Sequence, residues 1–507
     1  MEFFNNVGHD FNNVTMIKTG TANNNLQFRY TQNCTFKDVS MTKVAVQIIF
    51  QENYNNTYED VDATQEGNQH ILFSHSRDNH YQNVTFNYPA SSSNTHMQYH
   101  NQRDTMVSFR VKHISTAGSP QFQGYKHSYD NHFGDFEFST VNTSVLPFFW
   151  AQRHFSADSF ILTNVDLARF HPSYTYNFED VKITGQCLNR TLLYSELAGT
   201  QVPFDASVTA HADYAIIKDI DASGAGTYTS ANSIDGGNVT GWPIGSGVNL
   251  YWIGGTGNWS DPNHWSLTSG GSSAGCLPSR GDNVFFDVNS FTAANQTVTV
   301  NVEAECRNMV WNNVNNPRIG GNQNLNIYGS IQLASNLTWN HTGWVYFQSR
   351  NAGQTIKTNG VQMRQIQFLG DDGVNTGVWT LQDDFDVLYD IYFKAGSFVS
   401  NGYDVKARSI FADDNDAGIS IDFSGTDKIT LRYRFEIQPN PTFNIGSADV
   451  YWENMEGGQY RLYGSNNTFN DLYFDHDDGA NPINIEGNNT VNNVNIESNN
   501  YPEVNFY

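Results

Sequence analysis

Basic residues are scarce in this sequence, and their scarcity excludes one class of partner. The 507 residues include 27 lysines and arginines against 51 aspartates and glutamates, which gives a net charge of −24 at pH 7. An acidic surface repels phosphate backbones, so we expect no nucleic acid among the partners. The same charge favours solubility and is compatible with binding of divalent cations.

Long apolar runs are lacking as well. No run of 18 apolar residues occurs, so the sequence predicts no membrane-spanning helix. The first residues carry no basic segment followed by an apolar one, as a signal peptide would. Because the repeat described below is already under way at Asn12, we expect the chain to be a fragment of a longer protein.

Cysteine is sparse, with four residues and no C-x-x-C pair, which argues against a zinc site. Cys276 and Cys306 bracket one compact segment and predict a disulfide, which would imply an oxidising compartment. Two unrelated buried thiols are the alternative.

A degenerate repeat of about 22–25 residues dominates what is present, and such a period indicates one structural unit stacked many times. Its signature is an aromatic residue, any residue, Asn or Asp, and then Val. It occurs at 11–14, 36–39, 58–61, 81–84 and 178–181, with a variant at 133–136. An alternating apolar strand precedes the signature in most repeats, for example at 26–30 and 46–50.

Polar corners separate these strands, and asparagine is unusually abundant. Asn, Asp and Gly tolerate left-handed backbone angles at corners, and stacked Asn side chains can form hydrogen-bonded ladders. The sequence therefore predicts an all-β, right-handed parallel β-helix (solenoid) in two consecutive stacks. An antiparallel sandwich is the alternative, but the hairpin dipeptides that it needs are scarce.

Glycine and serine mark a boundary between the two stacks. We expect parallel β-helix repeats at 1–221, a Gly/Ser-rich junction at 222–250, a Trp/Gly-rich capping segment at 251–310 and a second β-helix-like region at 311–507. In the capping segment, Trp252, Trp259 and Trp265 either cover the open end of the second stack or, as the alternative, Trp259 and Trp265 form a platform for a sugar ring.

The segment YWIGGTGNWSDPNHWS at 251–266, followed by CLP-x-x-x-DNVFFD, resembles the repeats of very large cell-surface adhesins of Bacteroidota. Those of gliding bacteria (SprB-type) are exported by type IX secretion. The resemblance covers about 250–500, whereas residues 1–240 resemble only generic pectate-lyase-like β-helix repeats.

This resemblance implies a segment of an extracellular adhesin or filament on the surface of a Gram-negative bacterium. Such a segment acts by surface binding and as an elongated rod, and it is not an enzyme. The partners that it implies are surface glycans or other surface polymers, other segments of a larger adhesin, and the outer-membrane export machinery.

Histidine and arginine cluster in the first stack and suggest an alternative function. Side chains at equivalent positions of a β-helix form columns, so an outward groove is predicted with candidate ligand-binding residues Arg77, His100, Arg103, His127 and Arg153. A polysaccharide-binding or polysaccharide-cleaving β-helix would use this face of residues 70–155 for general acid–base chemistry. A solvated face with acid–base pairs between neighbouring rungs explains the same residues without a ligand.

Acidic clusters in the second stack suggest calcium. Asp413, Asn415 and Asp416 offer oxygen ligands within one short loop, although the loop does not complete an EF-hand pattern. Polar loops of an acidic protein are the alternative, and no other cofactor is expected.

Overall fold

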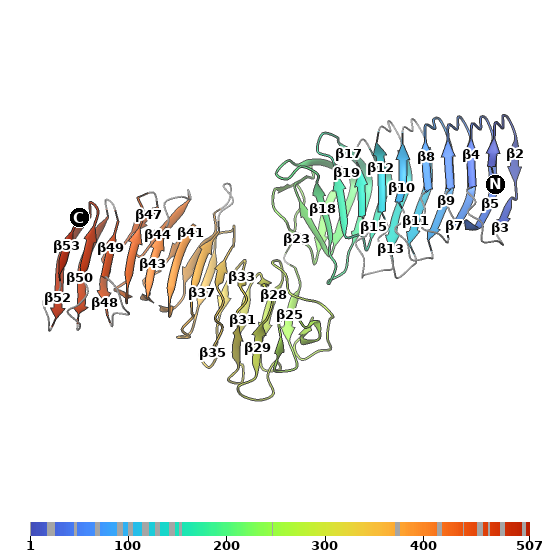
Figure 1. Ribbon diagram of the computed structural model, residues 1–507. Helices are drawn as coiled ribbons and strands as arrows, with labels where there is room; N and C mark the ends of the chain where they lie inside the picture. The colour runs from blue at the N-terminus through green and yellow to red at the C-terminus, as the bar shows by residue number, and fades with distance from the viewer. Residues whose placement is uncertain are drawn as a thin grey trace. The chain divides into compact units, whose positions relative to one another are not determined.

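The structure is a computed structural model of the chain, and it divides into two compact units, Met1–Gly247 (unit 1) and Val248–Tyr507 (unit 2). Figure 1 shows that both units are stacks of short strands (Figure 1). In the described part of the chain, the only helical element is the 3₁₀ turn η1 (Pro262–His264). The described residues are 2–17, 26–44, 48–65, 71–88, 95–99, 105–113, 121–126, 132–140, 148–151, 155–245, 247–370, 376–412, 418–439, 441–453, 460–464, 467–476, 482–498 and 503–507.

Unit 1 contains two long sheets in which every described strand pair is parallel. The first sheet has the order β1 (Glu2–Phe4), β4 (Leu26–Arg29), β6 (Ile48–Gln51), β8 (Ile71–Ser74), β10 (Thr95–Tyr99), β12 (Gln121–Lys126), β14 (Phe148–Ala151), β16 (Leu167–Phe170), β18 (Thr191–Ser195), β20 (Ala215–Lys218) and β23 (Ile234–Asp235). The second has the order β2 (Asp10–Asn12), β5 (Thr35–Val44), β7 (Thr57–Gln65), β9 (His80–Tyr88), β11 (Thr105–His113), β13 (His132–Thr140), β15 (Ser156–Thr163), β17 (Tyr176–Thr184), β19 (Val202–Asp213), β21 (Ile220–Asp221) and β24 (Val239–Thr240), with β3 (Thr15–Ile17) beside β5 and β22 (Thr227–Ala231) beside β19.

Unit 2 contains three sheets, the longest with 19 strands. Its order is β25 (Asn249–Trp252), β27 (Trp265–Ser266), β28 (Asn283–Phe286), β30 (Ala304–Cys306), β31 (Met309–Trp311), β33 (Leu325–Ile327), β34 (Ile331–Gln332), β36 (Val345–Phe347), β37 (Gln354–Lys357), β38 (Ile366–Leu369), β39 (Val378–Leu381), β41 (Asp390–Val399), β43 (Ser409–Ala412), β44 (Ile419–Asp422), β46 (Arg434–Ile437), β47 (Thr442–Asn444), β49 (Tyr460–Tyr463), β51 (Ile483–Glu486) and β53 (Val504–Phe506).

Two shorter sheets complete unit 2. One is β26 (Gly257–Asn258), β29 (Thr297–Val300), β32 (Arg318–Gly321) and β35 (Thr338–Trp339), and the other is β40 (Phe385–Asp386), β42 (Val405–Ala407), β45 (Lys428–Leu431), β48 (Asp449–Trp452), β50 (Thr468–His476) and β52 (Thr490–Ser498). The pairing of β25 with β27 is antiparallel, and the remaining described strand pairs of unit 2 are parallel. The predicted all-β parallel solenoid in two stacks is therefore confirmed.

The signature of the repeat has a backbone explanation. Its third residue takes a positive φ in four successive rungs, at Asn13 (53°), Asp38 (51°), Asp60 (54°) and Asn83 (51°). Asn and Asp are the side chains that best tolerate this left-handed conformation. The bend allows the aromatic residue and the valine three positions later to face the same interior, and Phe36 and Val39 are both buried.

Inside unit 1 the aromatic residues form a continuous ladder. Phe11, Phe36, Tyr58 and Tyr81 lie on successive rungs with ring centroids 4.9, 5.0 and 4.7 Å apart and nearly parallel planes. A second ladder from the other sheet meets this one edge to face, so the rungs lock in register.

Asparagine forms a second, polar ladder in the interior of the same rungs. The Asn56 side chain accepts a hydrogen bond from the backbone N–H of Cys34 (2.8 Å) and donates one to the carbonyl of Thr31 (3.0 Å). Asn79 repeats the pattern one rung later with the N–H of Asn56 and the carbonyl of Asn53, both at 3.0 Å. These amides satisfy corner backbone groups that burial removes from water.

The predicted junction at 222–250 is largely part of unit 1. Strands β22, β23 and β24 fall within it and pair with β19, β20 and β21. Trp242 closes this end of the stack by packing against Phe204 and Tyr228, with ring centroids 5.9 and 5.3 Å away. The division between the units lies at Gly247 and Val248.

The predicted disulfide between Cys276 and Cys306 is wrong. Cys306 lies in the inward face of β30 as a free thiol, fully buried among apolar neighbours. Burial raises the pKa of this thiol far above its usual value, so it stays protonated and unreactive.

Candidate ligand-binding surface

The Trp-rich segment begins unit 2 as a buried cluster. Trp252, Trp259 and Trp265 have exposed fractions of 0, 2 and 0%. Trp265 contacts both others edge to face, with ring centroids 5.0 and 4.9 Å apart. Its indole Nε1–H donates to the carbonyl of Trp259 at 3.0 Å, so the polar atom is also satisfied.

The residues between the tryptophans explain how the cluster closes. Asp261 caps the 3₁₀ turn η1, and His264 at the end of η1 stacks on Trp252 at 4.6 Å. A Cβ atom at Gly257 would lie 2.0 Å from His264 Nε2, so this position requires glycine. Because no ring face remains open, the predicted ligand-binding role of Trp259 and Trp265 is wrong. The burial favours the cap.

Of the predicted His/Arg face, Arg77 lies within the described residues. It is exposed at a corner, where parallel bridges connect Val7, Gln32, Tyr54 and Arg77 in a column. Its guanidinium lies 4.9 Å from the ring centroid of Tyr54. The described column of Val7, Gln32, Tyr54 and Arg77 therefore brings neither a carboxylate nor an imidazole to Arg77. The other predicted members, His100, Arg103, His127 and Arg153, lie outside the described residues.

The corner residues His75 and Asp78 have a structural explanation. Both have positive φ angles, 55° and 57°. One rung earlier Glu52 and Asn55 occupy the equivalent corners with φ of 52° and 53°. Because different side chains share the same positive φ, the corner requires a residue that tolerates this backbone conformation and does not require one particular functional group.

The predicted calcium ligands Asp413, Asn415 and Asp416 also lie outside the described residues. Among the residues that the structure does describe, no group of three His, Cys, Asp or Glu side chains is arranged to hold a metal ion.

Unit 1 has a shallow groove of about 450 Å³ over β15, β17 and β19. The carboxylates of Asp158, Glu179 and Asp205 line it, and the loop at Gly224 and Ala225 forms one wall. Phe178 forms part of the floor and is buried, so the groove presents polar groups without an open aromatic ring.

Unit 2 has an outward surface of a different character, which we call the aromatic surface: Trp344, Tyr346, Tyr392 and Phe411. Tyr346, Gln367, Tyr392 and Phe411 occupy equivalent positions on β36, β38, β41 and β43. Their neighbours along each strand are buried, whereas these side chains are partly exposed. They therefore project from the outer face of the 19-stranded sheet.

Ring contacts join the aromatic surface into one cluster. Trp344 lies nearly parallel to Tyr346 with centroids 6.3 Å apart and meets Tyr392 edge to face at 5.6 Å. Tyr392 stacks on Phe411 at 4.6 Å. Trp344 thus bridges the rung of β38, where the outward residue is Gln367 and not an aromatic one.

Polar atoms on this surface are available to a ligand. Within the described residues, Trp344 Nε1, the hydroxyls of Tyr346 and Tyr392, and the Gln367 amide make no hydrogen bond to protein. Because none of these atoms is buried without a partner, solvent reaches each of them. Partial burial raises the pKa of both tyrosines, with Glu303 adding to the effect at Tyr346 and Asp390 at Tyr392. The hydroxyls therefore remain protonated donors.

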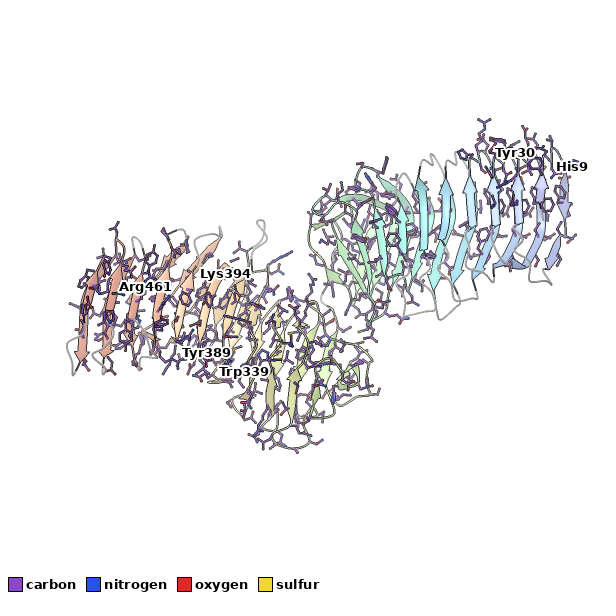
Figure 2. All side chains as sticks on the ribbon, viewed as in Figure 1. His9, Tyr30, Trp339, Tyr389, Lys394 and Arg461 are labelled. Carbon is purple, nitrogen blue, oxygen red and sulfur yellow. The ribbon has the colours of Figure 1, made fainter. Side chains whose placement is uncertain are left out.

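Charges around the aromatic surface are mostly neutralised in pairs. Asp390 receives two hydrogen bonds from Arg408, one of 2.9 Å from Nε and one from Nη2. Arg461 lies between Glu436 (3.0 Å) and Glu486 (2.8 Å). Figure 2 labels Lys394 and Arg461 on this unit, and the Lys394 amine lies 6.0 Å from the Tyr392 ring centroid (Figure 2).

Sequence reasoning missed the aromatic surface, although a signal was present. Segments 344–347 and 391–393 are apolar at every position, so an aromatic residue occupies the outward position of a solenoid strand as well as the inward one. In a strand exposed on one face, such a run indicates an apolar patch at the surface.

Comparisons with protein-family models, curated proteins and solved structures give no significant match to this chain. No helix in the described part of the chain is long and apolar enough to cross a membrane. The geometry alone therefore defines the class, which is a parallel β-solenoid of two units with an outward aromatic surface on the second.

Proposed function

We propose that this chain is a segment of an extracellular cell-surface adhesin or filament that binds a surface polysaccharide through the aromatic surface of unit 2. The observation that carries the proposal is the joined cluster of Trp344, Tyr346, Tyr392 and Phe411 on the outer face of the 19-stranded sheet. The resemblance of the Trp-rich segment to Bacteroidota adhesins supports the same assignment.

The chemistry of the surface suits a sugar polymer. Aromatic rings offer apolar area to the C–H face of a pyranose at low cost in conformational entropy, and their polar edges offer hydrogen bonds. Tyr346 and Tyr392 supply hydroxyls, Trp344 an indole N–H and Gln367 an amide. Rings on several rungs bind a chain and not a single sugar.

The solenoid contributes reach and rigidity. Each unit is a stack of hydrogen-bonded rungs, in which neighbouring rungs stabilise each other. We infer that the segment acts by binding and spacing and not by catalysis, on the surface of a Gram-negative bacterium. Other segments of a larger adhesin and the outer-membrane export machinery are its proposed protein partners.

Affinity electrophoresis of the full chain in gels that contain single polysaccharides tests the proposal. Retardation by at least one polysaccharide is expected, and Trp344→Ala or Tyr392→Ala should weaken it tenfold or more, the loss typical of a central aromatic contact. Tyr451→Ala is the matched control, because Tyr451 stacks on Tyr473 at 4.3 Å on another sheet while Lys428 covers its ring at 4.1 Å.

Equal retardation of all variants would place binding elsewhere and contradict the role of the aromatic surface. Release of new reducing ends or of unsaturated products from any polysaccharide would contradict the non-catalytic part of the proposal. That result would favour the alternative of a polysaccharide-cleaving β-helix.

A further inference from the structure

We infer that the ligand of the aromatic surface is a neutral polysaccharide chain, and that it lies along the solenoid axis across the rungs of β36, β38, β41 and β43. This inference rests on the proposed function and adds the charge class and the direction of the ligand.

The direction follows from the register. Tyr346, Gln367, Tyr392 and Phe411 are aligned on four consecutive rungs. Rungs of a parallel sheet lie about 4.8 Å apart, so the column spans roughly 14 Å along the axis. Across the strands the surface is only as wide as Trp344 and Tyr346 side by side. A linear chain therefore makes the most ring contacts when it runs along the column.

The charge class follows from the arginines near the column. Arg408 donates two hydrogen bonds to Asp390, and Arg461 forms ion pairs with Glu436 and Glu486. Arg434 contacts Glu436 at 3.4 Å and the hydroxyl of Tyr433 at 2.6 Å. A guanidinium whose donors are committed to a carboxylate has little attraction left for a uronate or sulfate group.

The two ends of the surface also favour a neutral ligand. Glu303 and Glu305 lie beside Tyr346 and Tyr328 at one end, where Asn326 and Tyr328 donate to them at 3.2 and 3.4 Å. At the other end, the position next to Phe411 on the following rung is Glu436, while Lys394 lies beside Tyr392 within the column. The polar atoms between the two ends, from Trp344, Tyr346, Gln367 and Tyr392, are all uncharged. With a net protein charge of −24, long-range repulsion opposes an anionic polymer further.

Calorimetric titration of the full chain tests the inference. The probes are neutral gluco-, manno-, xylo- and galacto-oligosaccharides of increasing length and galacturonan oligosaccharides of the same lengths. We expect at least one neutral series to bind, with affinity that rises with length until roughly 14 Å is covered and then levels off. Galacturonans should bind at least tenfold more weakly at low salt.

Charge-releasing variants sharpen the test. Asp390→Asn and Glu436→Gln free an arginine beside the aromatic surface, so the affinity for galacturonan should rise about fivefold. Glu453→Gln is the matched control, because it frees Lys428 from its 2.6 Å pair on the six-stranded sheet, away from this surface. Using two variants on the aromatic side guards against a folding defect in Asp390→Asn, where the aspartate is buried.

Failure of this inference is distinguishable from failure of the proposed function. Galacturonan that binds as tightly as the neutral series, and loses affinity in Trp344→Ala, would overturn the neutral class while the proposed function stands. Affinity that does not change with length beyond a monosaccharide would overturn the axial direction. Absence of binding to every neutral and acidic probe would overturn the proposed function and this inference together.

Discussion

The two units place aromatic residues differently, although both are parallel solenoids. In unit 1 the ladder of Phe11, Phe36, Tyr58 and Tyr81 lies inside the coil, one ring per rung. Unit 2 also has an internal ladder, in which the buried Phe347, Phe368 and Phe393 stack at 5.1 and 5.0 Å. In addition, its Trp344, Tyr392 and Phe411 rings lie outside. The same stacking geometry therefore stabilises the core of both units and also forms a surface on unit 2.

Outward rings also occur in unit 1, and their surroundings show what makes a ring available. Phe148 and Trp150 lie on the outer face of β14, but the Arg169 guanidinium covers them at 5.2 and 3.9 Å from the ring centroids. The Trp150 indole N–H donates to Glu196 at 3.2 Å. Because the guanidinium covers both rings and the indole N–H is already hydrogen-bonded, Phe148 and Trp150 have few groups free to contact a ligand. The aromatic surface of unit 2 differs because its polar edges have no protein partner among the described residues.

The largest effect is expected from removing the cap of unit 2. Trp265→Ala leaves a cavity among Trp252, Trp259 and Phe286 and should lower the free energy of unfolding of unit 2 by about 3–5 kcal/mol. Denaturant titration followed by near-UV circular dichroism should show the transition of unit 2 shifted and that of unit 1 retained.

Trp339→Ala is the control for this change, because Trp339 is partly exposed on β35 and should cost less. A common shift of both transitions in Trp265→Ala would show that the two units unfold together and would break the comparison between them.

A smaller effect is expected in the polar ladder of unit 1. Asn56→Ala leaves the N–H of Cys34 without a partner in a buried corner, whereas the carbonyl of Thr31 keeps the N–H of Tyr54 at 2.9 Å, so unit 1 should lose about 1–3 kcal/mol. Asn55→Gly is the neighbouring control. Asn55 is exposed with φ of 53°, an angle that glycine adopts freely, and its change should stay within about 0.5 kcal/mol. Equal losses in both variants would contradict a role for the internal amides.

The sequence was sufficient to predict the fold because the determinants of a solenoid are local. Each corner of unit 1 needs a residue that tolerates positive φ, and each rung needs apolar residues on one side of a strand. Both requirements are met within four positions at Asn13, Asp38 and Asp60, where the residue of positive φ is flanked by an aromatic residue and a valine. Such a pattern repeats visibly along the chain, so no long-range information is needed.

The candidate site could not be predicted in the same way, because burial depends on what covers a residue from elsewhere. Trp259 and Trp265 look like a platform in the sequence, yet each is covered by the other and by Phe286. Trp344 and Tyr392 are 48 positions apart and meet only because three rungs stack in register. Cys306 faces the core from β30, and its distance along the chain from Cys276 gives no sign of this.

The smallest effect is expected at Asp166 in the interior of unit 1. Among the described residues, its carboxylate is the one whose pKa is clearly raised. Asp166 is buried and accepts a hydrogen bond from the Asn189 amide, while its second oxygen has no partner. Burial raises the pKa of Asp166 to about 6, against the opposing effect of Asn189. Between about pH 4 and pH 6 the folded state therefore binds more protons than the unfolded state.

Stability contributed by this group is thus fully present below about pH 4 and is lost as the pH rises through about 6. The loss amounts to at most roughly 3 kcal/mol, since each unit of pKa shift corresponds to about 1.4 kcal/mol. Urea titrations of unit 1 at several pH values should show this decline in the wild type and not in Asp166→Asn. Parallel pH profiles of the two proteins would contradict it. Such an outcome would make the carboxylate equivalent to the neutral amides of Asn56 and Asn79 in the earlier rungs.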